Sequence, residues 1–187
     1  SERAELFHAS CGGMGLTGLI VAATLRLQRI DSAYIEQTTY KAANLEEALA
    51  LFETHSACTY SVAWIDCLAS GAALGRSLLM VGEHARDGQL VLPAKPKLSV
   101  PLDMPSFLLN RFSVQAFNGL YYQRIRVRES KQRVSYESFF YPLDGIQQWN
   151  RLYGKQGFVQ YQFVIPKVAG LQGMRAILER ISASHRG

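Results

Sequence analysis

Two stretches of the chain hold residues whose types and spacing suit the binding of a ligand. Gly13, Gly15 and Gly18 have the G-x-G-x-x-G spacing of a turn that binds a dinucleotide. In QYQFV, Gln160 and Gln162 are two residues apart, so in a strand both amides would point to one face and could hydrogen-bond a polyol such as a sugar. The simpler alternative for the glutamines is a strand face that meets water.

The order of elements around the glycines argues against a Rossmann unit. A Rossmann turn follows a strand and opens a helix, because the helix N-terminus supplies the amides that hold the pyrophosphate. Here a helix-like stretch, residues 2–9, precedes the glycines, and the strand-like stretch LIVAATLRLQRI, residues 19–30, follows them. Glycines would still let the backbone approach a flat ligand closely, and a tight helix-to-strand turn is the structural alternative.

The remaining periodicity predicts strands that alternate with helices. Asn44 and Glu47 form a capping box, which predicts a helix over residues 45–54. Four of the six prolines fall in residues 86–105, which predicts a long extended connection. We expect further strands over 19–30, 33–40, 58–66, 76–84, 133–141 and 158–165, and further helices over 2–9, 107–124, 145–153 and 168–183. This order predicts an α+β fold with a mostly antiparallel sheet and helices on one face, in which the first two strands pair as a hairpin.

The composition indicates a globular protein with a modest positive charge. The chain has 187 residues, 48% of them hydrophobic, and a net charge of +5. No nucleic-acid-binding motif accompanies this charge, so we do not expect a nucleic-acid partner. Cys11, Cys58 and Cys67 are odd in number and lack C-x-x-C spacing, which indicates neither a disulfide framework nor a metal site. No stretch approaches the roughly 18–20 consecutive apolar residues of a membrane span.

Three motifs resemble one family of enzymes. Residues 5–20, with the pattern E-L-F-x-A-x-x-G-G-x-G-L-T-G-x-I, resemble the end of the flavin-binding domain of FAD-linked oxidases of the vanillyl-alcohol oxidase superfamily. The more specific stretch YPLDGIQQWNRLYGKQGFVQYQFVIP, residues 141–166, is similar to the decaprenylphosphoryl-ribose 2′-oxidase subfamily. SVAWID, residues 61–66, matches a third segment of that subfamily. The three motifs follow the family's order over nearly the whole chain.

The resemblance implies two parts of an FAD-dependent oxidoreductase. Residues 1–30 would form the C-terminal edge of the FAD-binding domain, and residues 31–187 part of the substrate-binding (cap) domain. The family's pyrophosphate-binding loop and its C-terminal active-site strands have no counterpart in the sequence. We therefore expect an internal fragment that is inactive alone and has no catalytic residue of its own. The full-length protein would oxidise a sugar or alcohol by hydride transfer to the flavin.

The same resemblance implies binding residues for the cofactor and the substrate. The residues that would lie against the adenine end of FAD are Gly13, Gly15, Gly18 and Leu19. The residues that would contact the substrate are Trp64, Phe140, Leu143, Gln160 and Gln162. This chain has Phe140 and Tyr141 before the proline, where the ribose oxidases have tyrosine and then histidine, so the substrate need not be decaprenylphosphoryl-ribose.

A run of cations supports a rival interpretation. Residues 121–134, YYQRIRVRESKQRV, hold five cations and one acid, usually the mark of a solvated face. In a family that acts on polyprenyl phosphates, the run could attract the substrate phosphate or a lipid surface. The rival function is a non-catalytic module that binds an anionic ligand through residues 124–133. An enzyme should gather Trp64 and the two glutamines in one cavity, whereas such a module should place arginines around its pocket.

The expected partners follow from these interpretations. They are a small-molecule or polyprenyl-phosphate sugar as substrate and the N- and C-terminal parts of the same protein, with peripheral membrane contact left open. We expect a bacterial protein of the cytoplasm or of the membrane surface.

Overall fold

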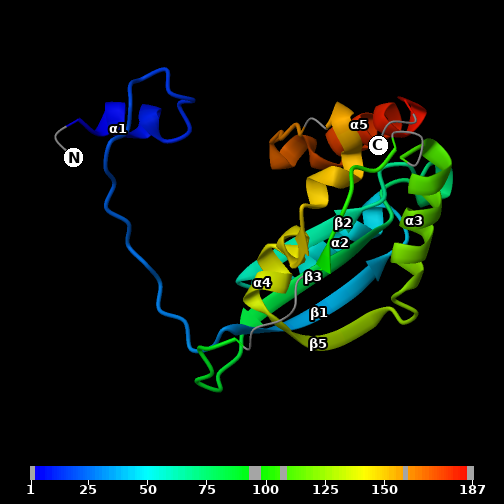
Figure 1. Cartoon of the computed structure of the whole chain (residues 1–187), viewed down its shortest axis with the longest axis horizontal. Coiled ribbons are helices and arrows are strands. Elements are labelled where there is room, and N and C mark those ends of the chain that lie inside the picture. The colour runs from blue at the N-terminus through cyan, green and yellow to red at the C-terminus, as the bar shows by residue number, and fades with distance from the viewer. Residues whose placement is uncertain (1–2, 93–97, 106–108, 158–159, 185–187) are drawn as a thin grey trace. The chain divides into compact units, whose positions relative to one another are not determined.

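The computed structural model describes residues 3–92, 98–105, 109–157 and 160–184, with the side chains of residues 155 and 156 left out. The chain forms two compact units, Ser1–Ile30 and Asp31–Gly187 (Figure 1), and each is described by itself. The first unit contains the helix α1, Ala4–Ser10, and the glycine-rich turn that follows it. Residues 19–30 have no regular secondary structure, so the strand predicted there is wrong. Leu25 and Leu27 are exposed, and no strand among the described residues supplies the hydrogen bonds that a strand requires.

The second unit is built on a four-stranded antiparallel sheet. The strand order is β2-β3-β1-β5, and the strands are β1 (Tyr34–Ala42), β2 (Tyr60–Ile65), β3 (Ser77–His84) and β5 (Glu129–Ser135). A separate parallel pair joins β4 (Leu98–Ser99) to β6 (Ile146–Gln147). The predicted α+β class with a mostly antiparallel sheet is confirmed. The predicted hairpin between 19–30 and 33–40 is wrong, because β1 is a central strand and both its edges pair with β3 and β5.

Local capping fixes the starts of two helices. α2 (Leu45–Thr54) begins at the predicted cap, where Asn44 Oδ1 accepts from the Glu47 backbone N–H at 2.9 Å. α3 (Arg111–Gln123) is capped by Asn110 and Ser113 in a capping box. The other helices are α4 (Tyr136–Phe140) and α5 (Gly170–Ser184), and short 3-10 turns cover Gly71–Ala73, Pro142–Gly145, Trp149–Gln156 and Lys167–Ala169.

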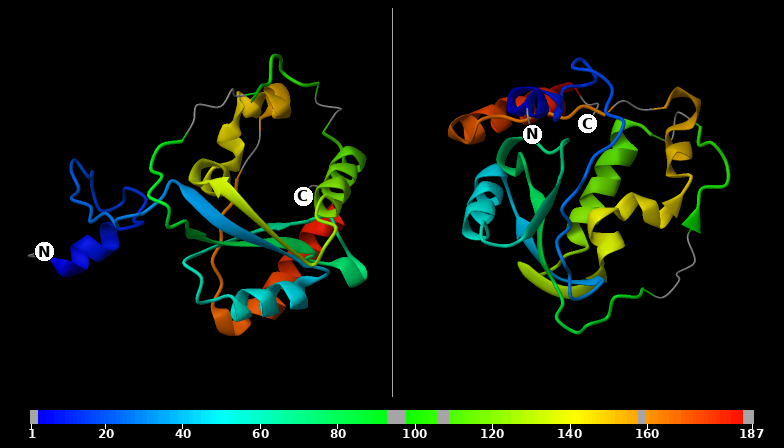
Figure 2. Two further views of the ribbon diagram at one scale, coloured as in Figure 1. Left: turned by 90° about the horizontal axis from the view of Figure 1, so that it is seen from below. Right: turned by 90° about the vertical axis from the view of Figure 1, so that its left-hand side faces the viewer.

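The helices lie on both faces of the sheet and not on one, as Figure 2 (left) shows. α2 and α5 cover a face that we call the leucine face, where Leu45, Leu74 and Leu178 form the buried core. α3 and α4 lie against the opposite face, which we call the aromatic face because it carries Tyr60 and Trp64. The prediction of one covered face was wrong because both faces of the sheet carry large side chains that need burial.

Three other predicted elements differ from the structure. Where a helix was predicted over residues 145–153, the chain forms the short strand β6 and the start of the 3-10 turn Trp149–Gln156. β5 ends at Ser135, whose Oγ accepts from the Ser138 backbone N–H at 3.2 Å and caps α4, so residues 136–140 are helical where a strand was expected. A strand was also predicted over residues 158–165. Residues 158–159 lie outside the described residues, and residues 160–165 have no regular secondary structure. Residues two apart in this segment still point to the same side, since the rings of Tyr161 and Phe163 stack with their centroids 6.4 Å apart.

Candidate functional site

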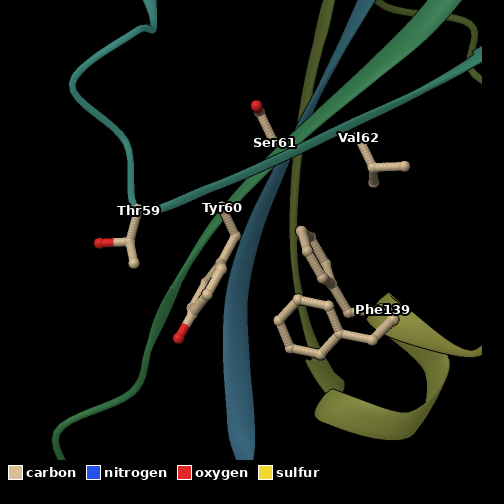
Figure 3. A pocket seen from close by; sticks show the side chains of 6 residues that line it. Thr59, Tyr60, Ser61, Val62 and Phe139 are labelled. Atoms are coloured by element: carbon tan, nitrogen blue, oxygen red, sulfur yellow. The ribbon is translucent and has the colours of Figure 1, made fainter. Parts of the chain in front are cut away.

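An open hollow on the aromatic face lies between β2 and α4 (Figure 3). It has a volume of about 410 Å³ and is lined by Thr59, Tyr60, Ser61, Val62, Phe139 and Phe140. The rings meet edge to face, with centroids 5.0 Å apart for both Tyr60–Phe140 and Phe139–Phe140. Such arrangements stabilise aromatic pairs beyond their burial, so the walls of the hollow are ordered although Phe140 stays 39% exposed.

A glycine beneath the hollow brings α4 close to the sheet. Gly82 of β3 lies opposite Tyr60 of β2. A Cβ atom at Gly82 would collide with Ile35 Cγ2 and would lie 3.0 Å from the Phe139 ring. The missing side chain at this position therefore makes room for Phe139, which forms the inner wall of the hollow.

Trp64 extends the aromatic face from β2 towards α3. It lies two residues beyond Val62, so both side chains point to the same face of the strand. Its ring is half-buried and lies 4.8 Å from the ring of Tyr121 on α3. The guanidinium of Arg124 lies 3.8 Å from the centre of the Tyr121 ring on the same helix end, a cation–π contact.

A buried carboxylate holds α3 against the sheet. Asp66, which follows β2, is 2% exposed. Its Oδ2 accepts two hydrogen bonds from Arg76, one from Nε at 2.8 Å and one from Nη2 at 2.6 Å. Its Oδ1 accepts from Asn118 Nδ2 of α3 at 2.8 Å and from the Leu68 backbone N–H at 3.1 Å. Because each contact has hydrogen-bond geometry, the network defines the position of α3 and of the Tyr121 ring on Trp64.

A second tyrosine of α3 strengthens the attachment. Tyr122 donates its hydroxyl to the Ala42 carbonyl oxygen at 3.0 Å, and burial raises the pKa of this hydroxyl. Lys41 Nζ lies 4.2 Å from its ring centre and also donates to the Ile125 carbonyl oxygen at 2.9 Å. These contacts make Tyr122 a structural residue of the helix and leave the aromatic face to Tyr121.

The structure brings some of the predicted substrate residues to one face and leaves others apart. Trp64 and Phe140 both lie on the aromatic face, Phe140 at the hollow and Trp64 farther along β2. Leu143 is exposed in the 3-10 turn Pro142–Gly145. Gln160 and Gln162 are exposed, and neither is among the residues that line the hollow beside Phe140.

Several residues of the site were not identified from the sequence as binding residues. Tyr60, Phe139 and Tyr121 contribute rings to the aromatic face, and Asn118 anchors α3. The alternation of Tyr60, Val62 and Trp64 along β2 was the one available signal for a shared face. The contacts with α4 and α3 involve segments distant in sequence, which periodicity does not reveal.

The glycine turn of the first unit has an open backbone surface. Gly15 and Gly18 have φ values of +78° and +133°, and a Cβ atom on either would meet nothing within 4 Å. Gly13 differs, since its Cβ would collide with the carbonyl oxygen of Ala9 in α1. Leu19 is exposed. Gly13 is thus required by local packing, whereas the turn around Gly15 and Gly18 can admit a flat ligand against its main chain.

The basic run does not surround the hollow. Arg133 pairs with Asp87 and donates to Gln89 Oε1 at 3.1 Å, and Lys131 pairs with Glu129 at 3.3 Å. No arginine lines the hollow in the part of the chain that the structure describes.

The described ranges lack a metal-binding cluster and a membrane-spanning helix. They contain no cluster of three or more histidine, cysteine or acidic residues that could hold a metal ion. They also contain no helix with the length and hydropathy needed to cross a bilayer.

Comparison with known proteins gives one relative along almost the whole chain. Decaprenylphosphoryl-beta-D-ribose oxidase of Mycolicibacterium smegmatis is 32% identical over 191 aligned positions, which cover 96% of this chain and 41% of the oxidase. The predicted resemblance is confirmed. This chain thus corresponds to less than half the length of the oxidase.

A second relative covers a shorter part of the chain. It is an uncharacterized protein in the mprA 5′ region of Streptomyces coelicolor, 35% identical over 112 positions, which cover 56% of this chain and 30% of that protein. No protein-family model matches the chain.

Proposed function

We propose that the chain is part of an FAD-dependent oxidoreductase that oxidises a sugar or alcohol hydroxyl by hydride transfer to the flavin. The observation that carries this proposal is the 32% identity to decaprenylphosphoryl-beta-D-ribose oxidase along 96% of the chain. Because the chain spans 41% of that oxidase, we propose that it provides binding surfaces and that the reaction needs the remainder of the protein.

The aromatic face supports a role in substrate binding. Trp64 and Phe140 present partly exposed rings, which pack on the C–H faces of a sugar and exclude water from them. Gln160 and Gln162 would add amide hydrogen bonds to the hydroxyls, and Leu143 an apolar contact near the entrance. In this proposal these five residues bind and orient the substrate, and none of them transfers a proton or hydride.

The first unit supports a role in holding the cofactor. The open main chain around Gly15 and Gly18, with Gly13 and Leu19 beside them, fits the approach of a planar adenine. Bound FAD would supply the hydride-accepting chemistry, which amino-acid side chains lack. In this proposal residues 1–30 belong to the edge of the FAD-binding domain and residues 31–187 to the cap domain.

We do not favour an anion-binding module as the main function. Its cations would have to converge on a pocket, whereas Arg133 and Lys131 pair with acids and Arg124 lies on the Tyr121 ring.

The test is the flavin absorbance near 450 nm, about the usual band of oxidised flavin, measured on the full-length protein and on this chain. We expect a yellow full-length protein and a colourless chain. In the full-length protein, Gly15→Val with Gly18→Val should remove bound flavin. The matched control is Gly88→Val, since Gly88 also has a positive φ and open space but lies in the second unit.

Substrate turnover gives an independent readout on the same protein. Phe140→Ala should raise KM for the sugar or alcohol while the flavin content stays unchanged. A full-length protein that is colourless and cannot be reconstituted with FAD would overturn the proposal.

A further inference from the structure

The outward side of α3 carries three large exposed apolar side chains, which is unusual for a surface helix. The inward residues Asn118 and Tyr122 are buried. Phe112, Phe117 and Leu120 are 73%, 59% and 75% exposed. At 100° per residue, these three side chains spread over about 140° of the helix circumference. A large apolar patch of this kind on a water-exposed helix is typical of a surface that contacts a partner or a membrane.

The segment that carries these apolar residues contains cations and no acid. Residues 104–128 contain four arginines, at positions 111, 124, 126 and 128, and no aspartate or glutamate. Arg126 and Arg128 are exposed on either side of Val127, itself 57% exposed, in the segment that follows α3. The main chain of Arg128 is fixed by the Lys41 backbone N–H, which donates to its carbonyl oxygen at 3.0 Å, but neither guanidinium has a hydrogen-bond or ion-pair partner among the described residues. The next acid, Glu129, pairs with Lys131.

The exposed apolar side chains and the arginines of this segment together indicate one class of partner. Exposed phenylalanine and leucine on one helix face, with arginines beside them and no acid, is the composition of helices that lie in the interface of an anionic bilayer. The apolar side chains enter the acyl boundary, and the arginine side chains reach the lipid phosphates. A purely apolar protein partner would leave the cations without a counter-charge.

We propose that the α3 surface, made of Phe112, Phe117, Leu120 and Val127 with Arg126 and Arg128, docks on an anionic lipid surface. This interaction goes beyond the proposed oxidoreductase function and does not depend on it, since it needs no flavin. The inner side of the same helix holds Tyr121 against Trp64. Docking through α3 would therefore bring the aromatic face near the lipid surface.

The test is co-sedimentation of the chain with vesicles of phosphatidylcholine and phosphatidylglycerol at low salt, compared with vesicles of phosphatidylcholine alone. We expect binding to the anionic vesicles that falls as salt is added. Arg126→Gln with Arg128→Gln should weaken binding at least about tenfold, because each cation near an anionic surface contributes about 1 kcal/mol. The matched control for charge is Arg86→Gln with Arg180→Gln, two exposed arginines outside the α3 surface.

The apolar part of the surface has its own variant. Phe112→Ser with Leu120→Ser should weaken vesicle binding. Leu102→Ser with Val168→Ser should not, although these two apolar residues outside α3 are 73% and 98% exposed. Circular dichroism checks that every variant folds.

Three results would overturn the proposal. The first is that the chain does not bind anionic vesicles. The second is that the variants and their controls lose vesicle binding equally. The third is that the chain self-associates without vesicles and that Phe112→Ser with Leu120→Ser abolishes this self-association. The last result would mean that a second copy of the chain covers α3. None of them would change the flavin content of the full-length protein, so the two proposals can fail separately.

Discussion

The two faces of the sheet hold their helices by different physical means. On the leucine face, Leu45 of α2 and Leu178 of α5 meet Leu74 in a core whose members are all buried. On the aromatic face, α3 is held by the carboxylate of Asp66, and its Tyr121 ring covers Trp64 only in part. Apolar packing fills the space between its elements. A polar network fixes a helix at a few points and leaves neighbouring rings partly open, which the proposed role in substrate binding would need.

The largest expected effect tests the polar attachment. Asp66→Ala leaves Arg76 and Asn118 without their acceptor, and removal of one partner from a buried ion pair costs about 3–5 kcal/mol of unfolding free energy. Urea unfolding measures this loss. Tryptophan fluorescence should change as well, because Tyr121 would no longer be held against Trp64.

An exposed ion pair provides the control for Asp66. Glu129→Ala breaks the contact with Lys131 on the surface, and solvent screening makes such pairs weak. If both substitutions cost the same small amount, the buried network would not be what holds α3.

The second prediction tests the leucine face. Leu178→Ala removes a side chain that is 3% exposed, and a cavity of this kind costs about 2–5 kcal/mol of unfolding free energy. Leu171→Ala on the same helix, at an exposed position, should cost much less. The vesicle binding proposed for α3 should be unchanged in folded Leu178→Ala, since the two helices lie on opposite faces. Equal costs at the two positions would argue against a core centred on Leu178.

The third prediction concerns the hollow. Gly82→Ala places a methyl group against Ile35 and the Phe139 ring, and such overpacking costs about 1–3 kcal/mol of unfolding free energy. Phe139 has to move, so the hollow should change shape and the near-ultraviolet circular dichroism with it. The control is Gly119→Ala on α3, where a Cβ meets nothing within 4 Å. An unchanged aromatic spectrum in Gly82→Ala would contradict the assigned packing of Phe139.

The smallest expected effect is a dependence on pH at the edge of the hollow. Glu83 Oε1 accepts from the Thr59 backbone N–H at 2.6 Å, and hydrogen bonds from Thr59 lower the pKa of Glu83 below its ordinary value of 4.5. A lowered folded-state pKa means that the unfolded chain binds the proton more tightly. This contribution to stability is therefore present above pH 4.5 and is lost as the pH falls through the lowered pKa.

The variant Glu83→Gln isolates that contribution. Its unfolding free energy should fall less between neutral pH and a pH below 4.5 than that of the unaltered chain, as measured by urea unfolding at each pH. Parallel pH profiles for the two proteins would show that the Thr59 contact adds no stability.

The sequence by itself determined the features that depend on neighbours along the chain. α2 begins directly after Asn44, because the Asn44 side chain accepts from the backbone N–H of Glu47 and caps the helix. The amphipathic pattern of residues 168–183 predicted α5. The motifs were also sufficient to predict the resemblance to the oxidase. The strands β1 and β3 were predicted from β-branched and alternating residues close to their observed limits.

Only the tertiary structure decided which strands pair and which side chains meet. Residues 19–30 have the composition of a strand but no partner strand in the described part of the chain, whereas β1 pairs with two strands, because strand hydrogen bonds come from segments distant in sequence. The same holds for the candidate site. Tyr60 and Phe140 line one hollow although they are far apart in the sequence, whereas Gln160 and Gln162, which share an alternating pattern, are not among the residues that line it. Spacing fixes which side chains share a face, but the packing of distant elements decides what that face meets.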